Sequence, residues 1–387
     1  MKVLIIAPRF PFPLEKGDKL RLYHQIRNLH GSVDLTLITL SDVKVEQGHY
    51  DELSKYVNKV YVFPLNKWGI FFESIGRIFS GLPFQVQYFY RKRIHKSIRA
   101  IIKDENPDVV YCQLARSAEY ARDYSGKKVL DYMDAFSYGM GKRIEGSNFL
   151  LKRFYKLEKK RMERYEKDIF PDFNAHTIIS EQDKFRIFKG KINSVQIVPN
   201  GVDTGYFAPQ PIEKKYDICF VGNMGYRPNV DAADFLCTRI IPQLVKIKPE
   251  LKVLIAGVRP HPRIKALQNS SITVSGWMED IREAYGSSKV FVAPIFTGIG
   301  QQNKVLEAMS MEMPCVCTTS VNLPIGSLHG KEVLVADELS DFVRYINLLL
   351  DDPEEACKLG KNARILVQKE YSWTKQVELL KLIFKTL

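Results

Sequence analysis

The chain contains 387 residues, of which 45 % are hydrophobic and 26 % are charged, as in ordinary globular proteins. These values exclude a disordered, collagen-like or low-complexity chain, and the length predicts two or three domains. The net charge of +13 suggests an anionic partner, such as nucleic acid, an acidic membrane surface or a phosphorylated ligand.

In the N-terminal half, short β-rich apolar runs alternate with longer amphipathic stretches. Leu22, Ile26 and Leu29 are spaced as one face of a helix, which predicts a helix over 18–30, and residues 145–168 have the pattern of a long charged helix. Strands that alternate with helices indicate a parallel sheet covered on both faces. The expected strands are 2–7, 33–40, 59–63, 108–112, 127–131, 174–179 and 194–198.

A second series of elements follows a turn-rich linker at 199–203 and 209–211. The fold class predicted is therefore α/β, with two doubly wound domains of similar size. Ligands in such sheets bind at the carboxyl ends of the strands, and two facing domains would form a cleft. We expect strands at 216–221, 252–256, 272–274, 289–293 and 314–317, and helices at 229–247, 261–268, 301–311, 338–350, 353–368 and 372–386.

The N-terminal apolar run ends at Pro8 and Arg9, and it is too short for the hydrophobic core of a signal peptide. No stretch approaches the ~20 apolar residues of a membrane span. The six cysteines form no CxxC pair and no zinc spacing, which favours buried thiols in a reducing compartment. We therefore expect a cytoplasmic protein, either free or peripheral on the inner face of the cytoplasmic membrane.

The most informative local pattern follows the strand expected at 289–293. Gly298 and Gly300 let backbone N–H groups approach a ligand, and the helix start beyond them favours an anion. Lys304 adds a full charge, and Glu307 lies one turn beyond Asn303 on the same face. A carboxylate there can accept hydrogen bonds from two vicinal ribose hydroxyls. The alternative is an ordinary strand–loop–helix crossover with a solvated Glu307.

Two further glycine turns follow strands. After 216–221 come Gly222, Asn223 and Gly225, and Arg227 is a forked donor suited to a pyrophosphate. Asn229 and Asp231 fit helix capping better than ligand binding. Near the N-terminus, Gly17 permits a turn and Asp18 is a helix-cap candidate. Lys19 and Arg21 of the same segment either line a cleft edge or face water.

Four motifs in this order resemble retaining glycosyltransferases of family 4, which have the GT-B fold of two Rossmann-like domains facing across a cleft. They are Lys16-Gly17-Asp18-Lys19, Pro199-Asn200-Gly201-Val202-Asp203, Phe220-Val221-Gly222, and Lys304-Val305-Leu306-Glu307-Ala308-Met309 followed by Pro314. The spacing fits nearly the whole chain, and the pattern is most similar to the exopolysaccharide- and exosortase-associated sugar transferases. The resemblance implies a nucleotide-sugar domain at 199–371, and an acceptor domain at 1–198 to which the helix at 372–387 returns.

The resemblance also implies roles for individual residues. Glu307 matches the second Glu of the family's Glu-x7-Glu motif, whereas Ile299 stands where the first Glu is expected, and Asn223 replaces the usual Arg. Pyrophosphate neutralisation therefore falls to Arg227, Arg259 or Lys304. The implied donor-binding set is Gly222, Asn223, Arg227, Arg259, Gly298, Ile299, Gly300, Gln301, Asn303, Lys304 and Glu307, and Gly17, Asp18, Lys19 and Arg21 form the acceptor-side set.

Many members of the family carry a His near the reacting carbon, and the corresponding region here has none. Asp134 is the best candidate to face the acceptor hydroxyl, although an Asp after a strand is often a helix cap. We thus expect Asp134 and Glu307 to be the catalytic residues. The chain contains no Asp-x-Asp motif, so neither metal nor other cofactor is expected, and protein cations would stabilise the leaving diphosphate.

The charge excess is confined to one half, because residues 1–200 hold 35 basic and 23 acidic side chains. Two segments concentrate it: 66–103 with eight Lys/Arg and one acid among many aromatic residues, and 142–167 with ten Lys/Arg and four acids. Such patterns fit an anionic lipid surface, or else a solvated basic face over an aromatic core. A lipid-linked or saccharide acceptor is therefore expected.

Two other functions compete with sugar transfer to an acceptor. A GT-B nucleotide-sugar epimerase would share the fold and the donor. A basic nucleic-acid-binding protein would explain the charge, but no recognised nucleic-acid module is present. We therefore expect no specific nucleic-acid binding, and predict a hexosyltransferase of surface polysaccharide biosynthesis.

Overall fold

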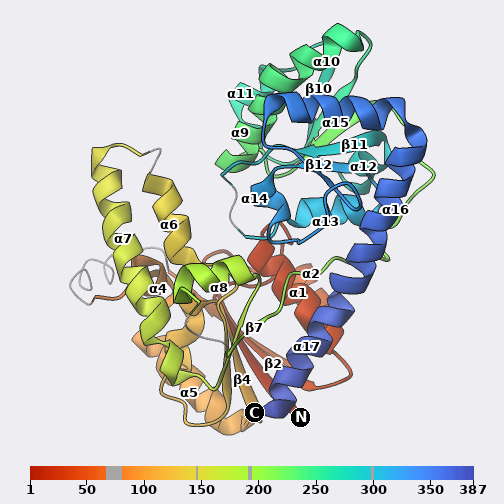
Figure 1. The fold of residues 1–387 in the computed structure, drawn as a ribbon. Coiled ribbons are helices and arrows are strands. Elements are labelled where there is room, and N and C mark those ends of the chain that lie inside the picture. The colour runs from red at the N-terminus through yellow and green to blue at the C-terminus, as the bar shows by residue number, and fades with distance from the viewer. Residues whose placement is uncertain (67–80, 145–146, 191–193, 298–299) are drawn as a thin grey trace. The chain divides into compact units, whose positions relative to one another are not determined.

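A computed structural model describes residues 1–66, 81–144, 147–190, 194–297 and 300–387. The chain divides into two compact units (Figure 1). Unit 1 consists of Met1–Asn200 together with Gln376–Leu387, and unit 2 consists of Gly201–Lys375. These boundaries lie close to the ones expected at 198 and 372.

Unit 1 contains a parallel sheet of seven strands in the order β3-β2-β1-β4-β5-β6-β7. The order reverses between β1 and β4, which is the point where doubly wound sheets bind ligands at the carboxyl ends of their strands. The strands are β1 Lys2–Ala7, β2 Asp34–Ser41, β3 Lys59–Pro64, β4 Val109–Gln113, β5 Lys128–Asp131, β6 Ala175–Ile178 and β7 Val195–Ile197.

Helices cover both faces of this sheet, as its apolar strands require. Leu22, Ile26 and Leu29 of α1 are fully buried on one face, which confirms the helix expected from their spacing. The described helices are α1 Gly17–Leu29, α2 Gln47–Ser54, α4 Phe84–Phe89, α5 Lys92–Glu105, η1 Ala115–Tyr120, α6 Phe136–Ile144, α7 Phe149–Asp168, η2 Phe170–Asp172 and α8 Glu181–Phe188.

The helix predicted over 145–168 is wrong at its start. It begins at Phe149, where the Asn148 side chain accepts a hydrogen bond from the Leu151 amide at 3.0 Å. A separate helix, α6, precedes it, and α6 and α7 pack against each other as a hairpin (Figure 1). The break follows from the Asn148 cap, since a side chain that accepts from the amide of the third helical residue starts a helix.

Unit 2 contains six parallel strands in the order β10-β9-β8-β11-β12-β13. The order reverses between β8 and β11, so the carboxyl ends of these two strands define its switch point. The strands are β8 Tyr216–Val221, β9 Val253–Ala256, β10 Ile272–Gly276, β11 Ser288–Ala293, β12 Cys315–Cys317 and β13 Leu334–Val335.

The long helix expected over 229–247 has a π-helical turn in its middle, η3, between α9 and α10. The last helix, α17, starts in unit 2 and ends in unit 1, where Val377, Leu380 and Phe384 join the core beside α1. The helices are α9 Arg227–Phe235, η3 Leu236–Ile240, α10 Ile241–Ile247, α11 Pro262–Lys265, α12 Arg282–Gly286, α13 Asn303–Ser310, α14 Thr319–Asn322, α15 Leu339–Asp351, α16 Pro353–Glu370 and α17 Trp373–Thr386.

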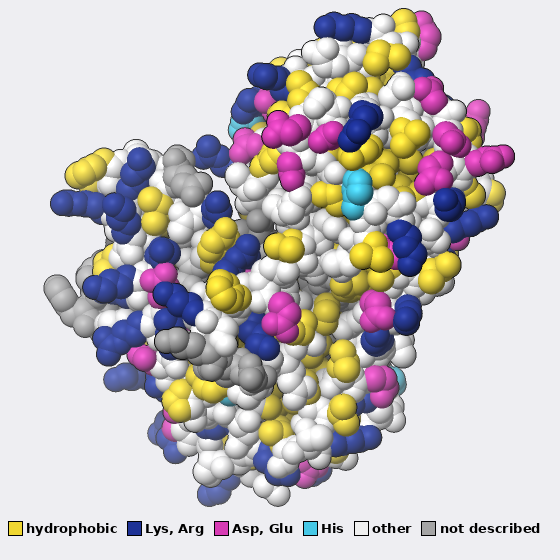
Figure 2. Space-filling view, viewed as in Figure 1, with side chains coloured by type: hydrophobic (Ala, Val, Ile, Leu, Met, Phe, Trp, Pro, Cys, Tyr) yellow, Lys and Arg dark blue, Asp and Glu magenta, His cyan; other side chains and the backbone are white. Residues whose placement is uncertain are grey.

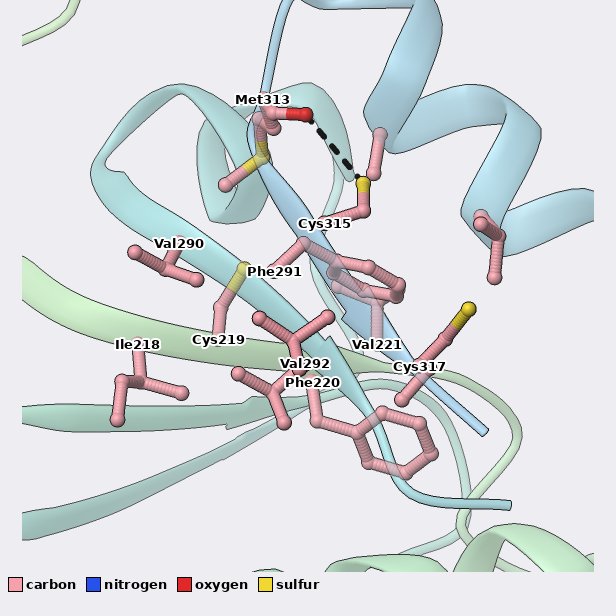
Figure 3. Packing of buried hydrophobic residues seen from close by; sticks show 14 of the residues in the cluster. Ile218, Cys219, Phe220, Val221, Val290, Phe291, Val292, Met313, Cys315 and Cys317 are labelled. Carbon is pink, nitrogen blue, oxygen red and sulfur yellow. Dashed lines mark hydrogen bonds between the residues drawn. The ribbon is translucent and has the colours of Figure 1, made fainter. Parts of the chain in front are cut away.

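The core of unit 2 is built from the central strands β8, β11 and β12. Figure 3 shows Phe220, Phe291 and Cys315 packed among aliphatic side chains, all three of them without solvent exposure. Every cysteine except Cys357 is buried, as predicted, and burial raises the pKa of Cys317 to about 12. These thiols therefore act as small apolar side chains. Both sheets confirm the predicted α/β class.

Across the described ranges, no helix combines the length and the apolar character needed to cross a bilayer.

Candidate functional site

In unit 2 the loops after β8 and β9 approach each other unusually closely. Gly257 has φ +138°, and a Cβ there would lie 1.8 Å from the carbonyl oxygen of Gly222. The Gly222 amide donates to the Ala256 carbonyl at 3.0 Å. Beyond it, the Asn223 side chain accepts from the Gly225 amide at 3.0 Å and closes a tight turn. The edge of the sheet is thus fixed directly beside the switch point.

Lys304, in the first turn of α13, reaches into this edge. Its Nζ donates to Asn229 Oδ1 at 2.5 Å, and Asn229 Nδ2 in turn donates to the Asn223 carbonyl at 3.0 Å. The ammonium lies 5.5 Å from the centre of the Phe220 ring. A Cβ on Gly222 would stand 2.8 Å from Asn229 Nδ2 and 3.3 Å from Lys304 Nζ. The position therefore requires glycine for this approach.

The Lys304 ammonium has no carboxylate within ion-pair distance in the described part of the chain. Burial lowers the pKa of Lys304 to about 8, and the charge of Glu307 opposes that shift. Among the described residues, amide oxygens and the Phe220 ring hold the cation, so a half-buried positive charge remains available to an anion.

Glu307 lies one turn further along α13. Tyr285, in the short helix α12 before β11, donates its hydroxyl to Glu307 Oε2 at 2.8 Å and approaches the Lys304 carbonyl at 3.3 Å. Burial raises the pKa of Glu307, and the Tyr285 hydrogen bond and the Lys304 charge oppose this. Oε1 has no protein partner among the described residues, so one carboxylate oxygen is left to accept from a ligand.

The other residues predicted to bind the donor differ in backbone conformation and burial. Gly300 has φ +69°, Gln301 is buried, and Asn303 is the first residue of α13. Arg259 is exposed, and its Cβ lies beside the Asn223 turn. The predicted ligand-contact residues Gly298 and Ile299 lie outside the described residues.

The helix-cap interpretation of Asn229 and Asp231 is wrong. Tyr226 is the N-cap residue of α9 and makes no side-chain cap bond. Asn229 instead holds Lys304, and Asp231 lies 3.6 Å from the Arg227 guanidinium. Arg227 is 73 % exposed at its side chain, so it does not share the half-buried setting of Lys304 and Glu307.

In unit 1 the acceptor-side candidates are held by their own neighbours. Asp18 accepts from Arg9 at 2.6 Å, and Lys19 donates to the Phe12 carbonyl at 2.6 Å. Gly17 begins α1 and meets only ordinary contacts, with a Cβ there lying 3.7 Å from Met133.

The expectation that Arg21 lines a cleft edge or faces water is wrong. Its side chain is fully buried and pairs with Asp131 at 2.8 Å. It also donates to the Val198 and Pro199 carbonyls and to Asn200 Oδ1. Arg21 thus fixes the end of unit 1, because a buried guanidinium needs all of these acceptors.

Asp134 follows β5 and is half-buried at the carboxyl edge of the unit 1 sheet. Burial and the nearby charge of Asp183 raise the pKa of Asp134 to about 7, and Arg21 opposes this shift. Asp183 lies in the first turn of α8, where its amide donates to the hydroxyl oxygen of the N-cap residue Ser180 at 3.1 Å. No hydrogen bond to the Asp134 carboxyl is formed within the described ranges. A carboxyl that titrates near neutrality suits general acid–base chemistry.

Two arginines at the same edge were missed in the sequence. Arg9 follows β1 and Arg116 lies in η1 after β4; their guanidinium carbons lie 5.3 and 5.8 Å from the centre of the Phe89 ring. Burial and the charge of Arg9 lower the pKa of Arg116 to about 10. Their positions directly after β1 and β4, the strands at the switch point, were the available signal.

The described residues contain no cluster of three or more His, Cys, Asp or Glu side chains that could hold a metal ion. The half-buried groups that the structure brings together are instead a cation, a carboxylate and backbone at a glycine turn. These groups match the phosphates and sugar hydroxyls of a nucleotide.

Part of unit 2 matches a known protein family, and two curated proteins are similar to the chain. Residues 215–352 match the family described as "Glycosyl transferases group 1". A protein in the cps region of Klebsiella pneumoniae, described as an uncharacterized 44.6 kDa protein, is 21 % identical over 396 residues, and the match covers 96 % of both chains. The UDP-Gal:alpha-D-GlcNAc-diphosphoundecaprenol alpha-1,3-galactosyltransferase of Escherichia coli is 24 % identical over 213 residues, covering 48 % of this chain and 53 % of its own.

Solved structures share the fold over the full length. Sucrose-phosphate synthase from Thermosynechococcus elongatus has a TM-score of 0.73 at 13 % identity and covers 100 % of this chain and 99 % of its own. HepE from Anabaena, in complex with UDP and glucose, has a TM-score of 0.69 at 13 % identity and covers 100 % of both chains. The chain therefore has the GT-B fold, and residues 215–352 of its unit 2 match the group 1 glycosyltransferase family.

Proposed function

We propose that the chain transfers a hexosyl group, with retention of configuration, from a nucleotide-sugar donor to a saccharide or lipid-linked acceptor. The observation that carries the proposal is the placement of Lys304, held by Asn229, and Glu307, held by Tyr285, one turn apart on α13 at the switch point of unit 2. Both lie inside the matched glycosyltransferase domain. The cation is suited to the diphosphate, and the carboxylate to a ribose diol.

The difficult step is departure of the nucleoside diphosphate, because negative charge grows on its oxygen as the sugar becomes oxocarbenium-like. A fixed cation and backbone N–H donors lower that barrier most where water is excluded. Lys304 is half-buried and held by Asn229, so it needs little reorganisation. Glu307 acts on the ribose, at a distance from the bond that breaks, and its contribution is to position the donor.

The proposed reaction needs no metal, because Lys304 supplies the charge that a divalent ion would otherwise bring. Activity should therefore persist in EDTA. Retention rests on the family resemblance of the motifs around Gly222 and Glu307, and an NMR assignment of the product anomer tests it.

The acceptor is proposed from the relatives and from unit 1. The similar Escherichia coli enzyme is named for a diphosphoundecaprenol-linked acceptor, and the similar Klebsiella protein lies in a cps region. We accordingly place this chain in surface polysaccharide biosynthesis, at the cytoplasmic face of the membrane. Asp134, with its pKa raised to about 7, is the group we assign to the acceptor hydroxyl.

A thermal-shift screen of nucleoside diphosphates and nucleotide sugars tests the donor site. A true donor raises the melting temperature with concentration, by mass action on the folded state. Lys304→Met should abolish the shift, whereas Arg263→Met, an exposed cation of the same unit, should not. A screen in which no nucleotide stabilises the wild type would refute the proposal.

The donor found in this screen can also be used to distinguish a glycosyltransferase from an epimerase. Incubation without acceptor should leave it largely intact; inversion at C2 with elimination of the nucleotide would instead show an epimerase. Tight, sequence-specific binding of nucleic acid at physiological salt would instead indicate a nucleic-acid-binding protein.

A further inference from the structure

The first half of α7 presents apolar side chains to solvent. We call residues 149–157 the hairpin tip, since they begin the second helix of the α6–α7 hairpin. Phe149 is 70 % exposed and Leu150 is 76 % exposed. Leu151, Phe154 and Leu157 are each more than 40 % exposed. Five large apolar side chains in nine residues form a patch of a kind that monomeric proteins keep for a partner.

The second half of the same helix packs normally. Glu158, Met162 and Tyr165 are buried against unit 1. Figure 1 shows α7 and α6 extending together beyond the layers of that unit. The apolar tip is therefore an extension of a well-anchored helix, and its exposure does not arise from a missing core contact along the rest of α7.

Polarity changes along one row of side chains on α7. Leu150, Phe154 and Leu157 occupy one row, at the i, i+4 and i+7 spacing, and the row continues with Arg161 and Arg164. Arg161 lies 5.0 Å from the centre of the Phe84 ring and Arg164 pairs with Asp168 at 3.1 Å, so the row is apolar at the end of the hairpin and polar toward the body of the unit. An interface between hydrocarbon and headgroups has the same gradient.

The tip itself carries only positive charge. Lys152, Arg153 and Lys156 are its charged residues, and no acid occurs between 149 and 157. The Arg153 guanidinium lies 5.1 Å from the centre of the Phe149 ring. Figure 2 shows yellow side chains at the end of the hairpin with dark blue ones beside them. Long basic side chains can keep their charge at the headgroups while the apolar groups enter the bilayer.

We propose that the hairpin tip inserts into the headgroup region of an anionic bilayer and anchors unit 1 there. The inference rests on the proposed function for one point only, namely that the acceptor is held in that membrane. A second copy of the chain is a poor occupant of the tip, because residues 1–200 carry 35 basic and 23 acidic side chains and two such units repel.

Vesicle sedimentation tests the inference with the full chain and without any donor. The probes are phosphatidylcholine vesicles, and phosphatidylcholine vesicles with about one third phosphatidylglycerol. We expect binding to the anionic vesicles and a fall of more than tenfold as salt is raised, because surface attraction decays within a Debye length. Absence of binding at low salt would overturn the proposal.

Two variants separate apolar insertion from simple charge attraction. Phe149→Ser with Leu150→Ser should lower the partition coefficient at least tenfold, since each apolar side chain that enters the bilayer contributes strongly to the free energy of binding. Replacing all three tip cations by Gln should lower it by a factor of about five per charge. The matched control is Phe185→Ser with Ile365→Ser, two side chains of similar exposure elsewhere, and it should bind as the wild type does.

A Trp at the tip provides a direct readout in a variant that keeps the apolar character. In Phe149→Trp, emission should shift to the blue and become protected from aqueous quenchers on adding anionic vesicles. An unchanged spectrum would contradict insertion. Light scattering that shows a dimer, dissociated by Phe149→Ser with Leu150→Ser, would assign the tip to self-association and overturn the proposal. Vesicle binding without sugar transfer would refute only the proposed enzymatic function.

Discussion

Replacing Glu307 by Gln isolates the charge of the carboxylate from its shape. Oε2 accepts the Tyr285 hydroxyl at 2.8 Å, and Oε1 is the oxygen without a protein partner among the described residues. The amide in Glu307→Gln would keep one oxygen acceptor, lose the charge and turn a donor toward either Tyr285 or the ligand. We expect the variant to fold normally and to bind nucleotide less well.

The magnitude follows from the type of hydrogen bond. A bond to a charged group contributes about 1.5–3 kcal/mol, and a neutral one about 0.5–1.5 kcal/mol. Exchanging the first for the second at one ligand hydroxyl costs about 1–2 kcal/mol, which is roughly a five- to thirtyfold weaker Kd for the nucleoside diphosphate. Glu312→Gln, just beyond the end of the same helix, is the matched control and should leave the Kd unchanged.

Calorimetry with two ligands makes the test specific to ribose. The wild type should bind the ribonucleoside diphosphate more tightly than its 2′,3′-dideoxy analogue, and in Glu307→Gln this preference should shrink by about the same five- to thirtyfold. If the variant loses equal affinity for both ligands, Glu307 does not contact the diol. If it loses none, the assignment of α13 to the donor site is wrong.

Three further outcomes are expected. Arg21→Met leaves Asp131 buried without its cation, so the free energy of unfolding, measured by urea denaturation, should fall by about 3–5 kcal/mol. Arg263→Met removes an exposed cation and should lower it by less than about 1 kcal/mol. Equal losses in the two variants would refute the structural role of Arg21. Because burial lowers the pKa of Lys304 to about 8, the affinity for a diphosphate should fall as pH rises through that value in calorimetry, and a flat profile would exclude this cation. Burial raises the pKa of Asp134 to about 7, so its stabilising contribution is present at low pH and is lost as pH rises through that value; Asp134→Asn should raise the melting temperature in mildly alkaline buffer and change it little in acid.

The local parts of the donor site could be predicted from the sequence. Lys304 and Glu307 are three residues apart on one helix, so a strand–glycine–helix pattern suffices to place them on one face. The partners of these residues could not be predicted. Asn229 is 75 residues from Lys304 and Tyr285 is 22 residues from Glu307, and only the order β9-β8-β11 brings their segments together.

Arg21 shows the opposite error. Its place near a glycine turn suggested exposure, but the spacing of Leu22 and Ile26 does not reveal which flank of α1 faces the sheet. The decisive contacts, to Asp131 and to residues 198–200, depend on β5 and on the end of unit 1. Long-range burial of a charge leaves no periodic signal in a single sequence.

The two proposed ligands would account for the difference in net charge between the two halves of the chain, because they present charge differently. A nucleoside diphosphate carries its charge on a few atoms, and one positioned cation with backbone N–H donors can neutralise it at short range. A domain that binds it therefore needs almost no excess of basic residues, and residues 201–387 contain 22 basic and 21 acidic side chains. An anionic bilayer is a diffuse surface, and attraction to it sums over many cations that need not be positioned. The excess in residues 1–200 therefore matches the proposed membrane partner, whereas a site for a small phosphorylated ligand in unit 1 would need no more than a local pair such as Arg9 and Arg116.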